Sequence, residues 1–260
     1  MYADGREIEL TVGKTVFDYA DSLKLRVPTS CGRTGECHEC IIEIKQGQSS
    51  LSKPSASESF LGDNYRLACQ AYVSDSDSDV EFATLRRQPR ILTKRAPRTV
   101  QLAPRATTKN DKVYIDDAPV ANYTGAILGL AGDIGTTTVG LNLVDLESGS
   151  ILHTSSFENP QRFGGSDVMN RISYDSGVFR GELQQTMLSA INFEIGNMVK
   201  LLGFHRRQIF DAVFVGNTTM RDILFGIDVQ AIGEKPYKSL IQIEHEDRRR
   251  KTTAMDTSAL

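Results

Sequence analysis

The pattern of hydrophobic and polar residues divides the first third of the chain into short strands and helices. Polar and apolar residues alternate over 6–12, as in a half-buried strand of a hairpin, and apolar residues recur with helical spacing over 15–25. A short β-prone run follows at 41–45, and residues 55–58 fit a capping box that predicts a short helix. These elements predict a small α+β unit over residues 1–83.

A second pattern begins near residue 126 with an apolar, strand-like run. Further strands, one long amphipathic helix and one short helix follow it. We predict strands at 139–144, 151–157 and 209–215 and helices at 180–202 and 218–225. Three strands, a helix, a strand and a helix are typical of an α/β layer arrangement, which we expect over residues 126–240.

The segment between these units, residues 84–125, lacks such periodicity. It is rich in Lys and Arg and contains Pro89, Pro97 and Pro104. We interpret it as a basic, proline-stiffened linker. The alternative is a docking patch for an acidic partner or nucleic acid, although no aromatic residues are interleaved as in single-strand binding.

The last segment, residues 241–260, is polar and has neither helix nor strand periodicity, which predicts disorder or the end of a truncated reading frame. The length of 260 residues favours two domains. With 40% hydrophobic residues and a net charge of −3, the composition selects neither nucleic acid nor membrane as a partner. No apolar run is long enough for a membrane span and the first residues do not resemble a signal peptide, so we expect a cytoplasmic protein.

All four cysteines lie in one short stretch. Three have the spacing C-x5-C-x2-C, and the fourth follows 29 residues later; they are Cys31, Cys37, Cys40 and Cys69. Three thiolates on one loop and a fourth from a distant strand suit a four-sulfur cluster. The alternatives are a zinc site, two disulfides or four unrelated buried cysteines. We expect His38, which lies between two of the cysteines, to be a surface loop residue rather than a ligand.

This stretch resembles the [2Fe–2S] ferredoxins, with the spacing of their adrenodoxin-like branch, and the Leu-Ala-Cys-Gln sequence at 67–70 matches the same family. The resemblance implies one-electron transfer. It also implies a ubiquitin-like (β-grasp) α+β fold, in which a sheet wraps around one helix. In this family the four cysteines would hold the cluster.

A turn rich in glycine and threonine joins the first two strands of the second unit. Asp133, Gly135, Thr136 and Thr137 stand in this hairpin, where backbone N–H groups and hydroxyls can meet phosphate oxygens and the carboxylate can hold Mg²⁺. Asn217 follows a buried strand at a helix start, a second candidate anion site. The alternative at both places is an ordinary structural turn.

The strand order and the Asp-x-Gly-Thr hairpin resemble the ribonuclease-H-like first lobe of the actin-like ATPase superfamily (ASKHA). This resemblance implies that the five residues named above bind the phosphates and Mg²⁺ of ATP, with Asp133 as the candidate catalytic residue.

The combination of both units resembles the reductive activators of corrinoid proteins. The matching motifs beyond the cysteines are 133–138, 159–161, 165–168, 171–173 and 215–220. The resemblance implies that electrons from an upstream donor pass through the cluster to a Co(II) corrinoid protein, which ATP hydrolysis helps to reduce to Co(I).

The family's ATPase domain has a second lobe with further nucleotide motifs, which no pattern after residue 240 supplies. ATP hydrolysis by this chain is therefore open, and we expect a truncated activator. Two other hypotheses stay open: a [2Fe–2S] electron carrier with a vestigial ATPase lobe, and a regulatory nucleotide-binding protein with a structural metal site.

Overall fold

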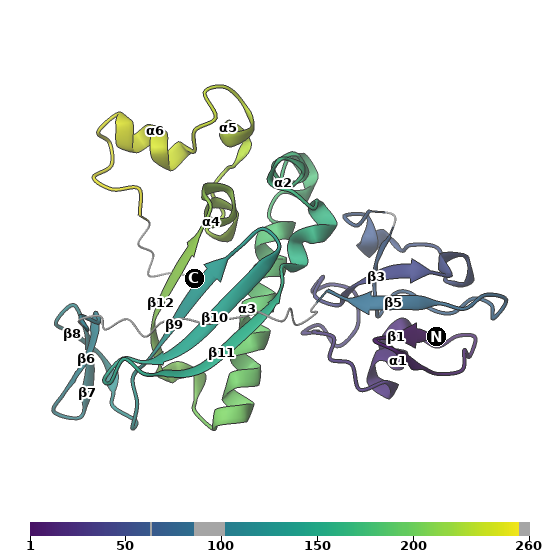
Figure 1. Ribbon diagram of the computed structural model, residues 1–260, viewed down its shortest axis with the longest axis horizontal. Coiled ribbons are helices and arrows are strands. Elements are labelled where there is room, and N and C mark those ends of the chain that lie inside the picture. The colour runs from purple at the N-terminus through teal and green to yellow at the C-terminus, as the bar shows by residue number, and fades with distance from the viewer. Residues whose placement is uncertain (63, 86–101, 255–260) are drawn as a thin grey trace.

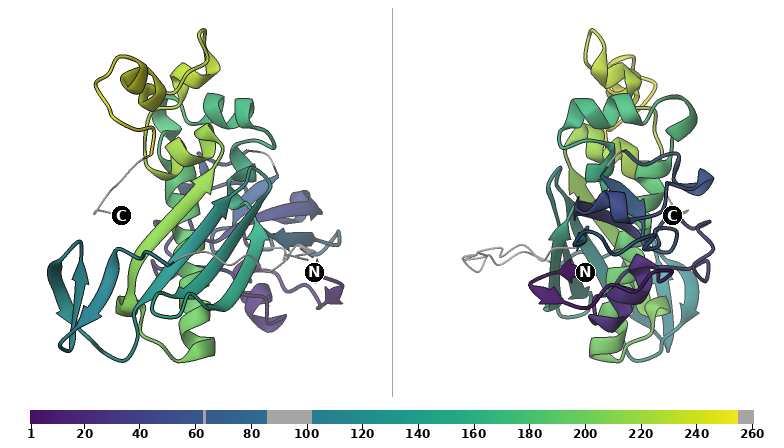
Figure 2. Two further views of the ribbon diagram at one scale, coloured as in Figure 1. Left: turned by 60° about the vertical axis from the view of Figure 1, so that its left-hand side comes forward. Right: turned by 90° about the vertical axis from the view of Figure 1, so that its right-hand side faces the viewer.

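The computed structural model describes residues 1–62, 64–85 and 102–254. Within these residues the chain forms three sheets, of five, four and three strands. The N-terminal five-stranded sheet lies beside the four-stranded sheet of the second unit. The three-stranded sheet lies at the opposite end of the molecule (Figures 1 and 2). Helices at the C-terminal end of the chain extend above the four-stranded sheet (Figure 1).

The N-terminal unit packs a five-stranded sheet, in the order β2-β1-β5-β3-β4, against helix α1. Its elements are β1 (Tyr2–Ala3), β2 (Arg6–Glu7), α1 (Val16–Ser22), β3 (Ile41–Gln46), β4 (Tyr65–Leu67) and β5 (Glu81–Thr84), with 3₁₀ helices η1 (Gln48–Ser50) and η2 (Ala56–Glu58). Strands β1 and β5 are parallel and the other pairs are antiparallel. This mixed sheet around one helix confirms the predicted fold class. The first hairpin is shorter than the alternation predicts.

Helix α1 begins where Thr15 and Asp18 form a reciprocal capping box, in which each side chain accepts a hydrogen bond from the other residue's backbone N–H. The helix then buries Val16, Phe17, Tyr19 and Ala20 against the sheet. The loop that follows α1 carries three of the four cysteines, so the capped helix fixes where this loop starts.

The second unit is built on a four-stranded sheet in the order β11-β10-β9-β12. Its strands are β9 (Leu128–Ile134), β10 (Thr138–Asp145), β11 (Ile151–Glu158) and β12 (Ile209–Gly216). Strand β12 is parallel to β9, while the other neighbours are antiparallel. The predicted strands and helices of this unit are present within a few residues of their expected bounds, as an α/β layer arrangement requires.

One face of this sheet is covered by the long helix α3 (Glu182–Leu202), whose buried side includes Leu183, Met187, Ala190 and Ile191. Shorter helices lie around the hairpin end of the sheet: η3 (Pro160–Gly164), α2 (Val168–Tyr174), η4 (Gly177–Phe179), α4 (Thr218–Leu224) and α5 (Gln230–Gly233). At the opposite end, η5 (Arg206–Gln208) leads into β12. Among the described residues, no helix combines the length and apolar character that crossing a membrane requires.

The predicted linker contains a sheet that the sequence analysis does not predict. Strands β6 (Ala106–Lys109), β7 (Lys112–Ile115) and β8 (Ala118–Asn122) form an antiparallel meander. Each of its two turns consists of two residues with positive φ, Asn110-Asp111 and Asp116-Asp117, the backbone of tight hairpin turns. The linker interpretation is therefore wrong for these residues. Their strands have only four or five residues each and give little periodic signal. The part of that linker over 86–101 lies outside the described residues.

The predicted disordered tail also needs a correction. Helix α6 (Leu240–Glu246) begins at Ser239, whose hydroxyl accepts a hydrogen bond from the Gln242 backbone N–H at 3.1 Å. Only Ile241 of this helix is buried, so its apolar periodicity is too weak to be read from the sequence. Residues 255–260 of that tail lie outside the described part of the chain.

Candidate functional site

The cysteine loop between α1 and β3 curls tightly through left-handed backbone positions. Gly32 and Gly35 have φ angles of 67° and 91°, and Arg33 and His38 adopt 73° and 53°. Glycine takes these angles without steric cost. A Cβ atom at Gly35 would lie 3.0 Å from the Gln70 side chain, so the loop also approaches the residue after the fourth cysteine.

The four cysteines are arranged as two pairs of sulfur atoms. Cys40 Sγ lies 3.4 Å from Cys69 Sγ, and both residues are buried. Thr29 Oγ1 lies 4.0 Å from the sulfurs of both Cys31 and Cys37, which are partly exposed. Throughout the described ranges, no group of three or more His, Cys, Asp or Glu residues converges tightly enough to hold one metal ion. Two sulfur pairs fit a two-iron cluster better than a tetrahedral zinc ion.

The electrostatics of the loop favour thiolates, the form in which cysteine binds metal. Burial alone raises the pKa of Cys31, but hydrogen bonds from the Thr34 side chain and from backbone amides outweigh it and lower this pKa to about 5. A hydrogen bond from the Cys40 thiol lowers the pKa of Cys69 to about 7, and the same bond raises the pKa of Cys40. The donors around these sulfurs would equally stabilise the negative charge of a bound cluster.

The strand that leads to Cys69 is anchored by a buried ion pair. Arg66 Nε donates to Glu58 Oε1 at 2.8 Å, and both side chains are only 1% exposed. The backbone N–H of Leu67 donates to the same oxygen at 2.9 Å, and that of Ser55 donates to Glu58 Oε2 at 2.7 Å. The capping box predicted at 55–58 is present, and its glutamate also fixes the approach to the fourth cysteine.

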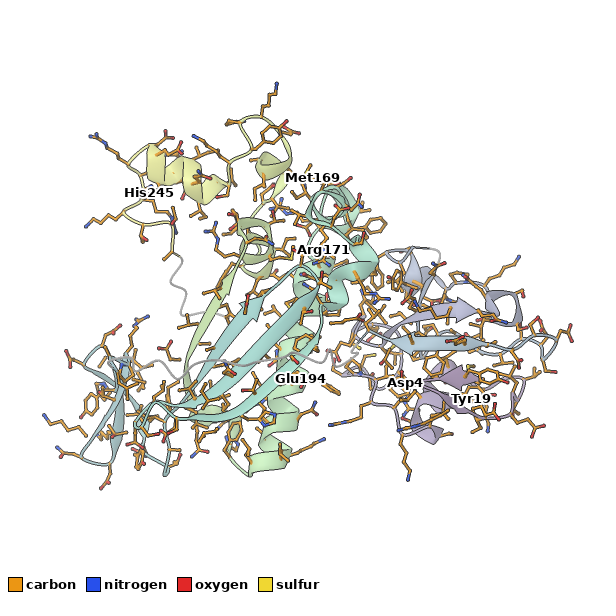
Figure 3. The ribbon with its side chains drawn as sticks, viewed as in Figure 1. Asp4, Tyr19, Met169, Arg171, Glu194 and His245 are labelled. Carbon is orange, nitrogen blue, oxygen red and sulfur yellow. The ribbon has the colours of Figure 1, made fainter. Side chains whose placement is uncertain are left out.

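The hairpin between β9 and β10 is tight and held from behind by buried side chains. The N–H of Gly135 donates to Thr138 O at 3.0 Å, and a Cβ at Gly135 would lie 2.5 Å from that oxygen. Asn159 Nδ2 donates to Gly135 O at 2.8 Å, and Arg171 Nη2 donates to Thr136 O at 2.7 Å. Arg171 belongs to α2 and lies at this end of the sheet (Figure 3). The backbone carbonyls of Gly135 and Thr136 thus point toward the protein interior.

The structure brings the second predicted motif to the same edge of the sheet. Because β12 is parallel to β9, Val215 pairs with Asp133, and Asn217 follows next to the hairpin. Asn217 Nδ2 donates to Thr136 Oγ1 at 3.1 Å, while its oxygen caps α4 by accepting from the Met220 N–H at 3.0 Å. The side chains of Asp133 and Thr137 are exposed beside them. The five predicted nucleotide residues therefore lie together.

His38 lies in the cysteine loop, as predicted, but its side chain is only partly exposed and has partners in both units. Its side chain is 22% exposed, its Nδ1 lies 3.0 Å from Glu182 Oε2 of α3, and its ring stacks on Phe60 with centroids 4.2 Å apart. The partner on α3 is distant in the sequence, so no local pattern could indicate this contact.

Three buried polar residues behind the hairpin were also given no role by the sequence analysis: Asn159, Gln161 and Arg171. Burial lowers the pKa of Arg171 to about 10, which leaves its guanidinium charged at neutral pH. The sequence carries one local signal for these residues. An Asn followed by Pro, as at Asn159 and Pro160, is typical of an N-cap residue at the start of a helix, here η3.

Comparison with known families agrees with both halves of this description. The family described as "RACo middle region" matches residues 128–257, and the "2Fe-2S iron-sulfur cluster binding domain" matches residues 1–74. The chain belongs to the family of the RACo middle region and carries a [2Fe–2S] ferredoxin domain at its N-terminus.

Individual relatives match either most of this chain or about a third of it. The protein "Corrinoid activation enzyme RamQ" of Eubacterium limosum is 23% identical over 89% of this chain and 46% of its own length. The "2Fe-2S ferredoxin" of Escherichia coli (strain K12) is 31% identical over 30% of this chain and 78% of its own length. A solved structure, "Reductive activator for corrinoid,iron-sulfur protein", matches with a TM-score of 0.50 and 24% identity over 91% of this chain and 50% of that one. This chain thus spans about half the length of the activators that it matches.

Proposed function

We propose that this chain is the redox part of a reductive activator of a corrinoid protein, with a nucleotide site that it builds in part. The observation that carries the proposal is the presence, in one chain, of two paired sulfur sets and a phosphate-type hairpin. The names of the relatives that it matches over most of its length support the corrinoid protein as its partner.

On the redox side, Cys31 and Cys37 would hold one iron, and Cys40 and Cys69 the other. When bound, the cluster supplies one-electron chemistry. One electron from an upstream donor would pass to Co(II) of the partner, which would become Co(I). Cys31 and Cys37 are partly exposed, so a partner could approach the cluster from this side of the loop, whereas Cys40 and Cys69 are buried.

On the nucleotide side, Asp133 would hold Mg²⁺ through water, and the hydroxyls of Thr136 and Thr137 would meet phosphate oxygens. Gly135 allows the tight turn, and Asn217 orients the Thr136 hydroxyl. An actin-like ATPase closes two lobes over its nucleotide, so we assign ATP hydrolysis to the complete activator.

The test uses the anaerobically purified and reduced chain, a Co(II) corrinoid protein and Mg²⁺–ATP. We expect the visible spectrum to report Co(I) formation, and we expect Asp133→Asn to weaken Mg²⁺–ATP binding about ten-fold or more while the cluster spectrum stays unchanged. Isothermal titration calorimetry measures the nucleotide binding.

Asp117→Asn is the matched control, because it makes the same change on an exposed turn of the small sheet. Electron transfer without any nucleotide binding would instead favour the simple electron carrier. A reduced chain that neither forms a complex with the corrinoid protein nor passes an electron to its cobalt would contradict the activator proposal.

A further inference from the structure

One face of α3 contacts the cysteine loop of the ferredoxin domain along several turns of the helix. Polar residues spaced three, four and eight positions apart share this face, as the helical period requires. Each of these residues forms a hydrogen bond or ion pair with the ferredoxin domain: Glu182 with His38, Gln185 with Cys37, Ser189 with Glu39 and Asn197 with Arg26.

The two central contacts reach the metal-binding segment itself. Gln185 Nε2 donates to the backbone carbonyl of Cys37 at 3.1 Å. Ser189 Oγ donates to Glu39 Oε1 at 2.9 Å, and the Ser30 hydroxyl donates to the same oxygen at 2.9 Å. The helix therefore holds the short stretch between the second and third cysteines from outside.

Backbone conformation explains why this stretch needs an external support. His38 adopts a φ of 53°, in the left-handed region that few residues other than glycine adopt. Glu182 holds its ring from one side, and Phe60 stacks against it at 4.2 Å. Because His38 connects two cysteines, its conformation sets the direction in which their side chains leave the loop.

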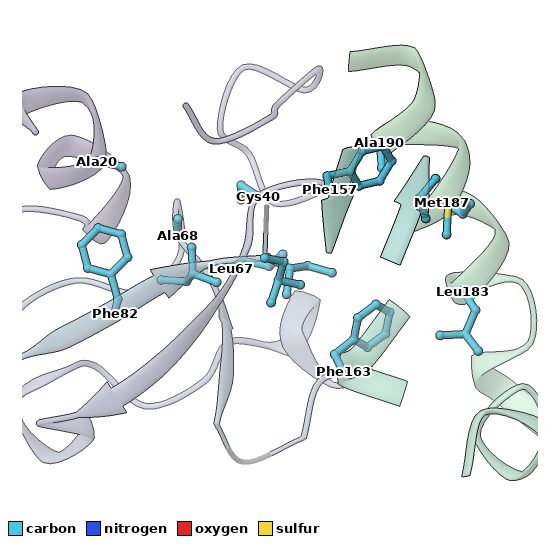
Figure 4. Close-up of a cluster of buried hydrophobic side chains, with 14 of the residues drawn as sticks. Ala20, Cys40, Leu67, Ala68, Phe82, Phe157, Phe163, Leu183, Met187 and Ala190 are labelled. Atoms are coloured by element: carbon cyan, nitrogen blue, oxygen red, sulfur yellow. The ribbon is translucent and has the colours of Figure 1, made fainter. Parts of the chain in front are cut away.

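Hydrophobic packing makes the contact between the domains continuous. Phe163 of the second domain meets Phe60 and Tyr65 edge to face, with ring centroids 5.9 Å and 6.5 Å apart. Tyr174 Oη donates to the carbonyl of Phe60 at 2.5 Å. Figure 4 shows that Cys40 and Leu67 of the ferredoxin domain belong to the same buried cluster as residues of α3.

The other side of α3 is anchored to the hairpin that carries the candidate phosphate site. Gln161 Nε2 donates to the carbonyl of Leu183 at 2.9 Å, in the first turn of α3. Asn159 Nδ2 reaches Gln161 Oε1 at 3.1 Å as well as Gly135 O at 2.8 Å. The first turn of the helix is thus held by the second domain at the same place where Glu182 contacts the cysteine loop.

We infer that Glu182, Gln185 and Ser189 are positioning residues of the iron–sulfur site, so that the second domain helps to set the properties of the cluster. This inference rests on the part of the proposed function that places a cluster on the four cysteines. The reduction potential of a cluster depends on hydrogen bonding and solvent exposure around its sulfurs. The contacts from α3 reach the backbone carbonyl of Cys37 and the side chains of His38 and Glu39, and they thereby fix the segment that presents the second and third cysteines.

The test compares the wild-type chain with Gln185→Ala, Glu182→Ala and Glu182→Gln, all with the cluster bound. An EPR-monitored redox titration gives the midpoint potential and the g values, and a chelator assay gives the rate of iron loss. We expect the two alanine variants to change the potential and g values and to lose iron about ten-fold faster. Glu182→Gln keeps an oxygen that accepts from His38 and should stay close to the wild type.

Gln184→Ala is the matched control, because the Gln184 side chain, next to Gln185 in the sequence, donates instead to the backbone carbonyl of Leu224 within the second domain. Alanine variants that keep the wild-type potential, g values and iron-loss rate would overturn the inference, as would equal changes in Gln184→Ala. A wild-type chain that binds no iron would refute the proposed cluster. A normal cluster whose potential, g values and iron-loss rate are the same in all α3 variants would refute only the inference about α3.

Discussion

Replacing Cys69 with alanine is expected to abolish the [2Fe–2S] cluster. Its sulfur is one of a buried pair with Cys40, and the chain has only four cysteines, so no other thiol can substitute. A cluster of this type needs four ligands, and a three-sulfur site exposes one iron to water and loss. Absorption in the visible region and iron content should both fall to near zero in the anaerobically purified variant.

Ser22→Ala is a suitable control for this experiment, because Ser22 ends α1 on the exposed side of the same domain. We expect it to keep the wild-type spectrum. Full iron content in Cys69→Ala would show that Cys69 is not a ligand.

Replacing Glu58 with alanine is expected to destabilise the ferredoxin domain by about 3–5 kcal/mol, the usual cost of leaving one partner of a buried ion pair alone. The variant leaves Arg66 buried without its carboxylate and leaves the Leu67 N–H without an acceptor. Urea unfolding followed by circular dichroism measures the loss. The exposed Glu9→Gln change is the control and should cost little.

The same carboxylate makes a pH-dependent contribution to stability. Burial raises the pKa of Glu58, but hydrogen bonds from Arg66 and from the Ser55 and Leu67 amides outweigh burial and hold the pKa below its usual value of 4.5. The unfolded chain therefore binds the proton more readily, and stability is present above that value and is lost as the pH falls through the lower folded pKa. The stability difference between wild type and Glu58→Ala should shrink in this acidic range and stay constant near neutral pH; a difference that grows on acidification would contradict this assignment.

Local sequence patterns predict much of the five-stranded sheet, of the four-stranded sheet and of helix α3. The helix spacing over 180–202 corresponds to α3 at Glu182–Leu202, because its apolar residues from Leu183 to Met198 are buried. The cysteine spacing likewise indicates a cluster, since four sulfurs in that order have few other uses. Where buried residues recur with a regular period, the sequence alone predicts the helix or strand that they form.

The features that the sequence does not predict depend on short turns or on distant partners. The meander over Ala106–Asn122 relies on two-residue turns, Asn110-Asp111 and Asp116-Asp117, rather than on hydrophobic alternation. The ring of His38 finds its partner Glu182 only after the two domains have packed together. Arg171 is another such case, because its buried position becomes evident only when α2 lies against the hairpin.

Metal analysis of the anaerobically purified wild-type chain, combined with low-temperature EPR after reduction, tests the account most directly. We expect about two iron and two acid-labile sulfide per chain and the signal of a reduced [2Fe–2S] cluster. A folded chain that contains zinc, or disulfides among its four cysteines, and neither iron nor sulfide would contradict it.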